Sequence, residues 1–135
     1  MRTPEYTDSH DNIVPVEADT TLNSGGAVCL NAAGNAVEGG DTAGLRMAGT
    51  AVTDVDNSAG DAGDQSIAVR RGQSEFLNSE GDPVAQADAE KMVYLEDAKT
   101  ICKTGGTNRI AAGVLRRFNE KGNPVVDTRY TPDVI

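Results

Sequence analysis

The side chains that could act in catalysis are few and scattered in this sequence. His10 is the only histidine, and it lies between Ser9 and Asp11 in the run SHD. Adjacent residues of an extended segment do not converge as nucleophile, base and orienting acid, so this run does not predict a catalytic triad. Neither GGDTAG nor TGGTN is followed by the lysine and helix that a phosphate-binding loop needs. We therefore expect no catalytic residue, no cofactor and no enzymatic activity.

The acidic run DVDNSAGDAGD is the sharpest candidate for a metal site. Its side-chain oxygens could bind calcium, and they belong to Asp54, Asp56, Asn57, Asp61 and Asp64. An EF-hand loop would have glycine at its sixth position and glutamate at its twelfth, but Ala59 and Gln65 stand there. The alternative is a hairpin loop in which aspartate, asparagine and glycine support the turn geometry. The sequence favours the turn, assigns no metal ligand, and leaves a generic calcium loop open.

Cys29 and Cys102 are the only cysteines, and they lie in the apolar runs AVCL and TICK. The sequence contains no CxxC motif, so neither a zinc site nor a redox site is indicated. Cysteine in apolar surroundings usually behaves as a small buried hydrophobic residue. We expect both cysteines to be buried, and a disulfide is not required.

The basic residues include two adjacent pairs, Arg70–Arg71 and Arg116–Arg117. Adjacent residues of a strand point to opposite faces, so at most one member of a pair can face a given partner. For Arg70 and Arg71, one interpretation is a solvated charge. The other is an ion pair across a subunit interface, where the geometry of arginine suits a carboxylate.

The charge of the chain is uneven. Residues 1–69 contain eleven acidic and two basic side chains, whereas residues 70–135 contain ten of each. Phosphate binding needs a concentrated positive field, so we expect no nucleic-acid partner. No apolar run approaches the length of a membrane span, and the start MRTPEYTDSHD lacks the layout of a signal peptide. We expect no membrane partner and synthesis in a cytosol.

Short apolar clusters predict an all-β fold. Valine and isoleucine occur in short runs separated by glycine, asparagine and aspartate, at spacings of about 8–12 residues that are typical of a β-barrel or sandwich. We expect about eight to ten short strands, with one short helix after Asp82–Pro83. Pro15 indicates that the strand Asn12–Val16 lies at a sheet edge. Gly34–Asn35 predicts a tight turn, and Gly49 indicates a bulge or a close backbone approach. The longest strand is expected at Arg109–Phe118.

The chain divides into three parts by composition. We expect a flexible N-terminal arm at residues 1–11, a single β domain at 12–127 and a C-terminal tail at 128–135. Leucine, isoleucine, valine and phenylalanine together make up 26 of the 135 residues. The core is therefore thin, and contact with other subunits would add to its stability.

The order and spacing of six strand-and-turn phrases resemble the capsid cement or decoration proteins of tailed bacteriophages and prophages. The phrases are AVCLNAAGNAV, DTAGLRMAGTA, VDNSAGDAGD, IAVRRGQSEFLNS, VAQADAEKMVYLEDAKTICKT and TNRIAAGVL. The resemblance covers about residues 12–118 and departs from the family pattern at the C-terminus, where RRFNEKGNPVVDTRYTPDVI extends the chain.

This resemblance implies a small β-barrel or β-tulip-like domain, commonly a homotrimer, on the outer surface of the phage head. The implied partners are the major capsid protein and other copies of the chain. The implied location is the virion surface, after synthesis in the bacterial cytoplasm. Such a protein would stabilise the head by bridging capsomers. The residues expected to contact the capsid or another subunit are Arg2, Thr3, Pro4, Glu5, Tyr6, Arg70 and Arg71.

Two other functions remain open at this point. A tail or head–tail joining protein would also be small, β-rich and oligomeric, but it would form rings of about six or twelve subunits. A calcium-dependent glycan-binding β module would need exposed aromatic rings, and the sequence has only three tyrosines, two phenylalanines and no tryptophan.

Overall fold

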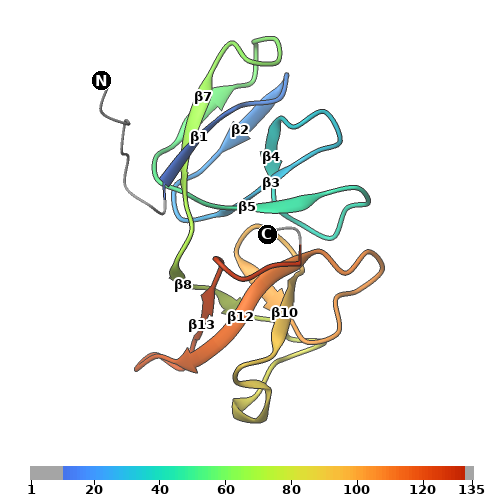
Figure 1. Cartoon of the computed structure of the whole chain (residues 1–135), viewed down its shortest axis with the longest axis vertical. Helices are drawn as coiled ribbons and strands as arrows, with labels where there is room; N and C mark the ends of the chain where they lie inside the picture. Colours follow the sequence, from blue (N-terminus) through green and yellow to red (C-terminus); the bar gives the residue numbers. More distant parts are fainter. Residues whose placement is uncertain (1–10, 133–135) are drawn as a thin grey trace, which may run out of the picture.

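The computed structural model describes residues 11–132 and is built almost entirely of β-strands (Figure 1). The all-β prediction is confirmed. The described residues form thirteen strands, more than the expected eight to ten, because several are only two or three residues long. The expected helix is a single 3-10 turn, η1 (Gln86–Asp88), shortly after Asp82–Pro83.

The strands fall into two halves along the chain. The first half contains β1 (Asp11–Pro15), β2 (Thr20–Leu22), β3 (Ala27–Leu30), β4 (Ala36–Glu38), β5 (Arg46–Ala51), β6 (Val55–Asn57) and β7 (Ser66–Arg70). The second half contains β8 (Gln73–Glu75), β9 (Leu77–Asn78), β10 (Met92–Leu95), β11 (Thr100–Cys102), β12 (Ala111–Phe118) and β13 (Pro124–Asp127). As predicted, the longest strand is β12, although it begins two residues later than expected.

Each half has its own large sheet. The first has the order β1-β7-β5-β3-β4, and the second has the order β8-β13-β12-β10-β11-β9. Strands β2 and β6 form a third, two-stranded sheet. In Figure 1 the first half lies above the second, and the chain passes from one to the other between β7 and β8.

The predicted barrel is not confirmed, because none of the three sheets closes in strand order. The chain nevertheless links the two edges of each large sheet. Val16, just after β1, forms a parallel bridge with Ala36 of β4. Only Phe76 separates β8 from β9, so one short stretch of chain pairs with β13 on one side and β11 on the other.

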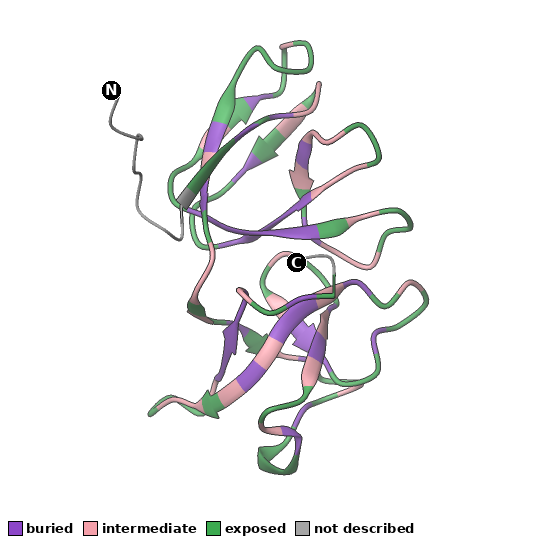
Figure 2. Ribbon diagram, viewed as in Figure 1, coloured by how far each residue is buried: buried purple, intermediate pink, exposed green. Residues whose placement is uncertain are grey.

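Two clusters of buried side chains form the core. One lies within the first half and includes Val14, Ile67 and Val69. The other spans both halves, since it joins Cys29 and Met47 of the first sheet to residues of the second such as Leu115. Figure 2 shows buried positions along β3 and β5 and along β12 and β13. The two sheets therefore share a hydrophobic core.

Two local expectations about the first sheet are confirmed. Strand β1 lies at the edge of its sheet, as Pro15 indicated. The pairing of β3 with β5 shifts register between Val28 and Cys29, opposite Gly49. A Cβ atom on Gly49 would lie 2.7 Å from the backbone oxygen of Arg70, and Gly49 has φ of +144°, so glycine is required there.

Candidate binding surface

The predicted contact residues are only partly placed by the structure. Residues 2–6 lie outside the described part of the chain. Arg70 is exposed at the end of β7, directly opposite Asp11 in the antiparallel register. The expected N-terminal arm is therefore attached to the fold beside Arg70.

Arg71 has an internal role that the sequence did not indicate. Its guanidinium donates hydrogen bonds to the backbone oxygen of Met47 in β5 and, at 2.7 Å, to that of Thr128. These bonds join the first half to the segment after β13. A contact of Arg71 with another subunit stays a prediction.

The segment expected to be a C-terminal tail begins inside the fold. Thr128 is fully buried, and its hydroxyl accepts a hydrogen bond from the backbone N–H of Gly72 at 3.0 Å. The backbone N–H of Thr128 donates to the oxygen of Gly72 at 2.9 Å. These bonds fix the beginning of the segment against the β7–β8 connection.

A row of apolar side chains crosses the outer face of β1, β7 and the end of β5. Ile13 is 72% exposed and Val52 is 37% exposed. Ile13 lies opposite Ala68 in the register, and the backbone N–H of Val52 donates to the oxygen of Ala68 at 3.0 Å. Side chains opposite each other in adjacent strands are neighbours on the same face. We call Ile13, Ala68 and Val52 the apolar row.

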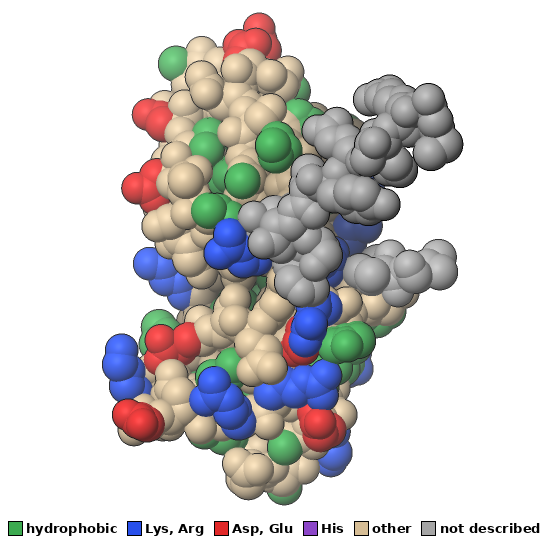
Figure 3. All heavy atoms as spheres, turned by 60° about the vertical axis from the view of Figure 1, so that its left-hand side comes forward, with side chains coloured by type: hydrophobic (Ala, Val, Ile, Leu, Met, Phe, Trp, Pro, Cys, Tyr) green, Lys and Arg blue, Asp and Glu red, His purple; other side chains and the backbone are tan. Residues whose placement is uncertain are grey.

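The apolar row is exposed because the second half covers only part of this sheet face. At the β3–β5 side, Cys29 and Met47 pack into the shared core. Thr50 lies opposite Arg70, and the Thr50 hydroxyl is 3.5 Å from the hydroxyl of Ser74 in the second half. On the β1 side of Thr50 the second half no longer covers the sheet, and no segment within residues 11–132 buries Ile13. Figure 3 shows hydrophobic side chains grouped on the first half, with few charged side chains among them.

Among residues 11–132, no strand pairs with the other side of β1. Val16 donates its N–H to Gln65 at 2.9 Å, and alternate residues of an antiparallel strand form such bonds. The backbone groups of Ile13 therefore point away from β7, toward the sheet edge. Pro15 has no N–H to offer there. An exposed edge strand with an exposed isoleucine is a ready place for another chain to bind.

The acidic loop has the structure of a turn. The carboxylate of Asp54 accepts from the backbone N–H of Ser24 at 2.7 Å, and that of Asp64 accepts from Asp61 at 2.9 Å. Hydrogen bonds from the side chain and backbone of Ser58 hold the pKa of Asp56 below its usual value. In the part of the chain that the structure describes, no group of three His, Cys, Asp or Glu could hold a metal ion. The structure thus supports the turn interpretation.

Both cysteines are buried and unpaired, as expected. Cys29 belongs to the core that the two halves share. Burial raises the pKa of the Cys29 thiol to about 12, and burial also raises the pKa of Cys102. Each thiol is therefore protonated near neutral pH, and the thiol is a poor nucleophile.

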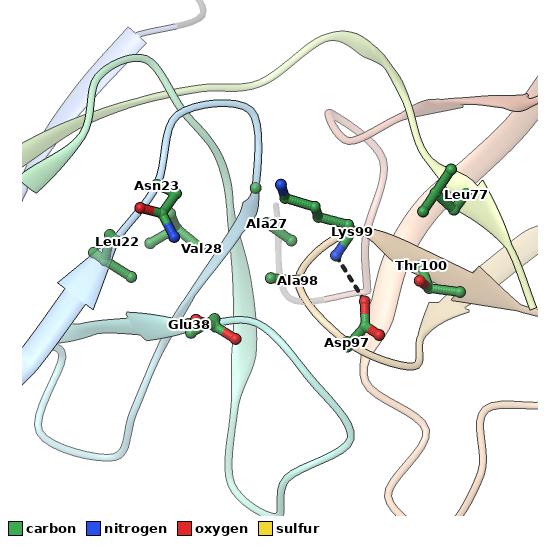
Figure 4. Close-up of a pocket in the computed structure, with 11 residues that line it drawn as sticks. Leu22, Asn23, Ala27, Val28, Glu38, Leu77, Asp97, Ala98, Lys99 and Thr100 are labelled. Carbon is green, nitrogen blue, oxygen red and sulfur yellow. Dashed lines mark hydrogen bonds between the residues drawn. The ribbon is translucent and has the colours of Figure 1, made fainter.

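A cavity of about 380 Å³ lies at the seam between the halves (Figure 4). Its walls are mainly apolar, with Leu22 and Ala27 from the first half and Leu77 from the second. Figure 4 shows the Lys99 side chain extended toward Asn23. The Asp97 carboxylate accepts a hydrogen bond from the Lys99 backbone N–H at 2.9 Å. The lining includes no serine, cysteine or histidine.

Comparison with known proteins gives no family assignment. No protein-family model, no curated protein and no solved structure matches this chain. The resemblance to capsid cement proteins therefore rests on the six sequence phrases. Within residues 11–132, no helix has the length and apolar character needed to cross a membrane.

The sequence contained a signal for part of the apolar row. In NIVPV, Val14 and Val16 alternate with Ile13 and Pro15, so one face of the edge strand had to point away from the core. The pattern predicts the strand, but it does not mark Ile13 as a contact residue. Its proximity to Ala68 and Val52 depends on strand order, which no local pattern contains.

Proposed function

We propose that this protein is a capsid cement subunit that binds the outer surface of a tailed-phage head and stabilises the head by bridging capsid proteins. The major capsid protein is its partner, and copies of the chain associate with each other, with a homotrimer as the expected form. The protein is made in the bacterial cytoplasm and resides on the virion.

The observation that carries this proposal is the apolar row at the free edge of β1. An exposed apolar patch beside an unpaired strand edge is typical of a protein interaction site. Asp11, the last residue of the expected arm, begins the same strand. A binding face and a preceding polar segment therefore meet at one edge of a sheet that is held firmly by the shared core.

The affinity for the shell depends on the apolar surface that each contact buries and on the number of contacts that one oligomer makes. Burying an isoleucine side chain contributes about 1.5–3 kcal/mol. One such contact is weak, but an oligomer that attaches at several points gains from effective concentration. A subunit with a small apolar contact can therefore bind a repetitive shell tightly.

The test is co-sedimentation with undecorated heads of the phage that encodes the protein. Ile13→Glu places a charge in the apolar row, and Ala32→Glu places the same charge on an exposed position of the β3–β4 turn, at the other edge of the sheet, as a matched control. Loss of the isoleucine contact corresponds to at least about tenfold weaker binding. We expect the wild type and Ala32→Glu to sediment with heads and Ile13→Glu to stay in solution. Equal binding of all three folded proteins, or no binding of the wild type, contradicts the proposal.

A further inference from the structure

A second surface feature lies in the second half, around Tyr130. This ring is 50% exposed. The guanidinium carbon of Arg116 lies 5.2 Å from its centroid, and that of Arg129 lies 5.6 Å away. Arg117 is exposed next to Arg116 on β12. We call Arg116, Arg117, Arg129 and Tyr130 the arginine–tyrosine cluster.

The buried carboxylate of Asp127 holds two arginines of the cluster in place. Asp127 is fully buried and accepts two hydrogen bonds from Arg129, at 2.9 and 2.7 Å. It also lies 3.5 Å from Arg116, whose other partner is Glu90 at 2.5 Å. The register shift in β12 between Leu115 and Arg117 is a bulge that re-aims Arg116. Side chains held in this way lose little freedom when a partner binds.

The composition of the cluster is that of a protein-binding hot spot. Tyrosine and arginine are the residues most enriched at positions that dominate binding energy.

The first half of the molecule carries a net negative charge, which is complementary to the arginines of the cluster. Residues 11–70 contain nine acidic and two basic side chains, a net of −7, whereas residues 71–132 contain nine of each. The loop of residues 54–64 carries four of the acidic side chains. In Figure 1 this loop, between β6 and β7, lies at the opposite end of the molecule from β12 and β13. Figure 3 shows Lys and Arg side chains gathered over the second half and the junction.

We propose that the arginine–tyrosine cluster binds the acidic loop, residues 54–64, of a second copy of this chain. The two surfaces are different and lie apart on one subunit, with the cluster in the second half and the loop at the far end of the first half, so the contact is head-to-tail rather than two-fold symmetric. Such contacts close into a ring when the rotation per subunit permits it. This inference deepens the self-association within the proposed function by naming its two surfaces, and it concerns the protein in the absence of heads.

Two contributions to the binding free energy of this contact, charge attraction and apolar burial, depend differently on salt concentration. Charge attraction between exposed groups is screened beyond about 8–10 Å at physiological ionic strength. Burial of the Tyr130 ring is an apolar contribution that salt does not screen. The assembly should therefore weaken, without disappearing, as salt is raised from low to moderate concentration.

The experiment is sedimentation velocity across a concentration series, with charge reversal on each side. Arg117→Glu changes the cluster without touching Asp127, and Asp61→Lys changes the loop at a carboxylate with no recorded hydrogen bond among the described residues. Each single variant should have a dissociation constant at least about tenfold higher than the wild type. Lys99→Glu makes the same charge change as Arg117→Glu at the seam cavity and should assemble like the wild type. Tyr130→Ala should assemble more weakly at all salt concentrations.

The decisive measurement is rescue. Mixing Arg117→Glu with Asp61→Lys gives two complementary contacts between unlike subunits, because the cluster of each variant meets a loop residue of opposite charge on the other. The mixture should therefore form assemblies in which the two variants alternate, although each variant alone is monomeric. The double variant should recover the assembly of the wild type. A monomeric wild type, assembly that is indifferent to both reversals, or failure of the mixture and the double variant to recover overturns the inference.

The same variants separate this inference from the proposed function. Arg117→Glu that is monomeric but still attaches to heads leaves the cement function standing and locates self-association at the cluster. If Ile13→Glu self-associates but does not attach to heads, head binding is located at the apolar row and self-association is independent of it. If the wild type attaches to heads through Ile13 yet never self-associates, the inference alone fails.

Discussion

Arg71 donates a hydrogen bond to the backbone oxygen of Thr128, which lies 57 positions later in the chain, at 2.7 Å. The same guanidinium donates to the oxygen of Met47. One side chain therefore connects the first sheet, the β7–β8 connection and the segment after the last strand. This connection is next to the shared core, so it contributes to holding the two halves in one arrangement.

Replacing Arg71 with alanine should destabilise the protein by about 1.5–3 kcal/mol, the range for hydrogen bonds to charged groups. Two buried backbone oxygens, of Met47 and Thr128, would lose their donors. Urea unfolding followed by circular dichroism measures the change. Lys99→Ala removes an exposed cation at the seam cavity and should stay within about 0.5 kcal/mol of the wild type. Equal stability of the two variants would contradict the internal role of Arg71.

Asn57 is the buried centre of the acidic loop. Its amide nitrogen donates to the backbone oxygens of Val16, Glu17 and Asp61, at 3.0 to 3.3 Å. Asn57→Asp replaces this donor with an oxygen that faces three acceptors, so we expect a loss of about 1–3 kcal/mol or more at neutral pH. The loss should be smaller at acidic pH, where the carboxyl group is protonated and can donate one bond. Asn23→Asp, at an exposed position, is the control, and a similar loss there would refute the assignment.

The sequence predicted what depends on neighbouring residues. Pro15 marked an edge strand, Gly34 and Asn35 marked a hairpin turn, and Gly49 marked an irregular position; all three are found. What could not be predicted depends on distant residues. The sequence left Arg71 as a solvated charge or an interface ion pair, and neither interpretation includes its hydrogen bond to Thr128. The apolar row exists only because β1, β7 and β5 are neighbours in the sheet.

The same limit applies to the arginine–tyrosine cluster. In the sequence, Arg116 and Arg117 are simply an adjacent basic pair. The bulge in β12 and the approach of Asp127 from β13 place Arg116 and Arg129 against one ring. A bulge is a property of strand pairing, so residue type alone did not reveal it.

Asp127 should make the stability of the protein depend on pH in the acidic range. Hydrogen bonds from Arg129 hold the pKa of this carboxyl below its usual value in the folded state. A depressed folded-state pKa contributes stability that is present above the unfolded value of about 3.9 and is lost as pH falls through the folded-state pKa. Asp127→Asn should lower stability at neutral pH by about 1.5–3 kcal/mol and should flatten the decline below about pH 4.

Urea unfolding at a series of pH values measures this dependence. Glu120→Gln, on the exposed hairpin between β12 and β13, provides a carboxylate-removing control and should follow the wild-type profile. An Asp127→Asn profile parallel to that of the wild type would show that Asp127 does not carry this part of the pH dependence.

Both thiols should be protected from reagents while the protein is folded. Cys29 is fully buried with a pKa of about 12, and Cys102 is 3% exposed. Labelling by a chromogenic disulfide reagent at pH 8 should be slow in buffer and complete in denaturant, because only an exposed thiolate reacts. Rapid labelling of Cys29 in the native protein would show that the shared core opens readily. A Cys102→Ser variant assigns the signal to Cys29.

The central claim is that this protein attaches to a phage shell through the face of β1, β7 and β5. Electron cryomicroscopy of undecorated heads mixed with the purified protein tests it most directly. The account predicts added density on the outer surface where capsid subunits meet, with Ile13, Ala68 and Val52 against the shell. Heads without added density, or bound molecules whose apolar row points to solvent, would contradict it.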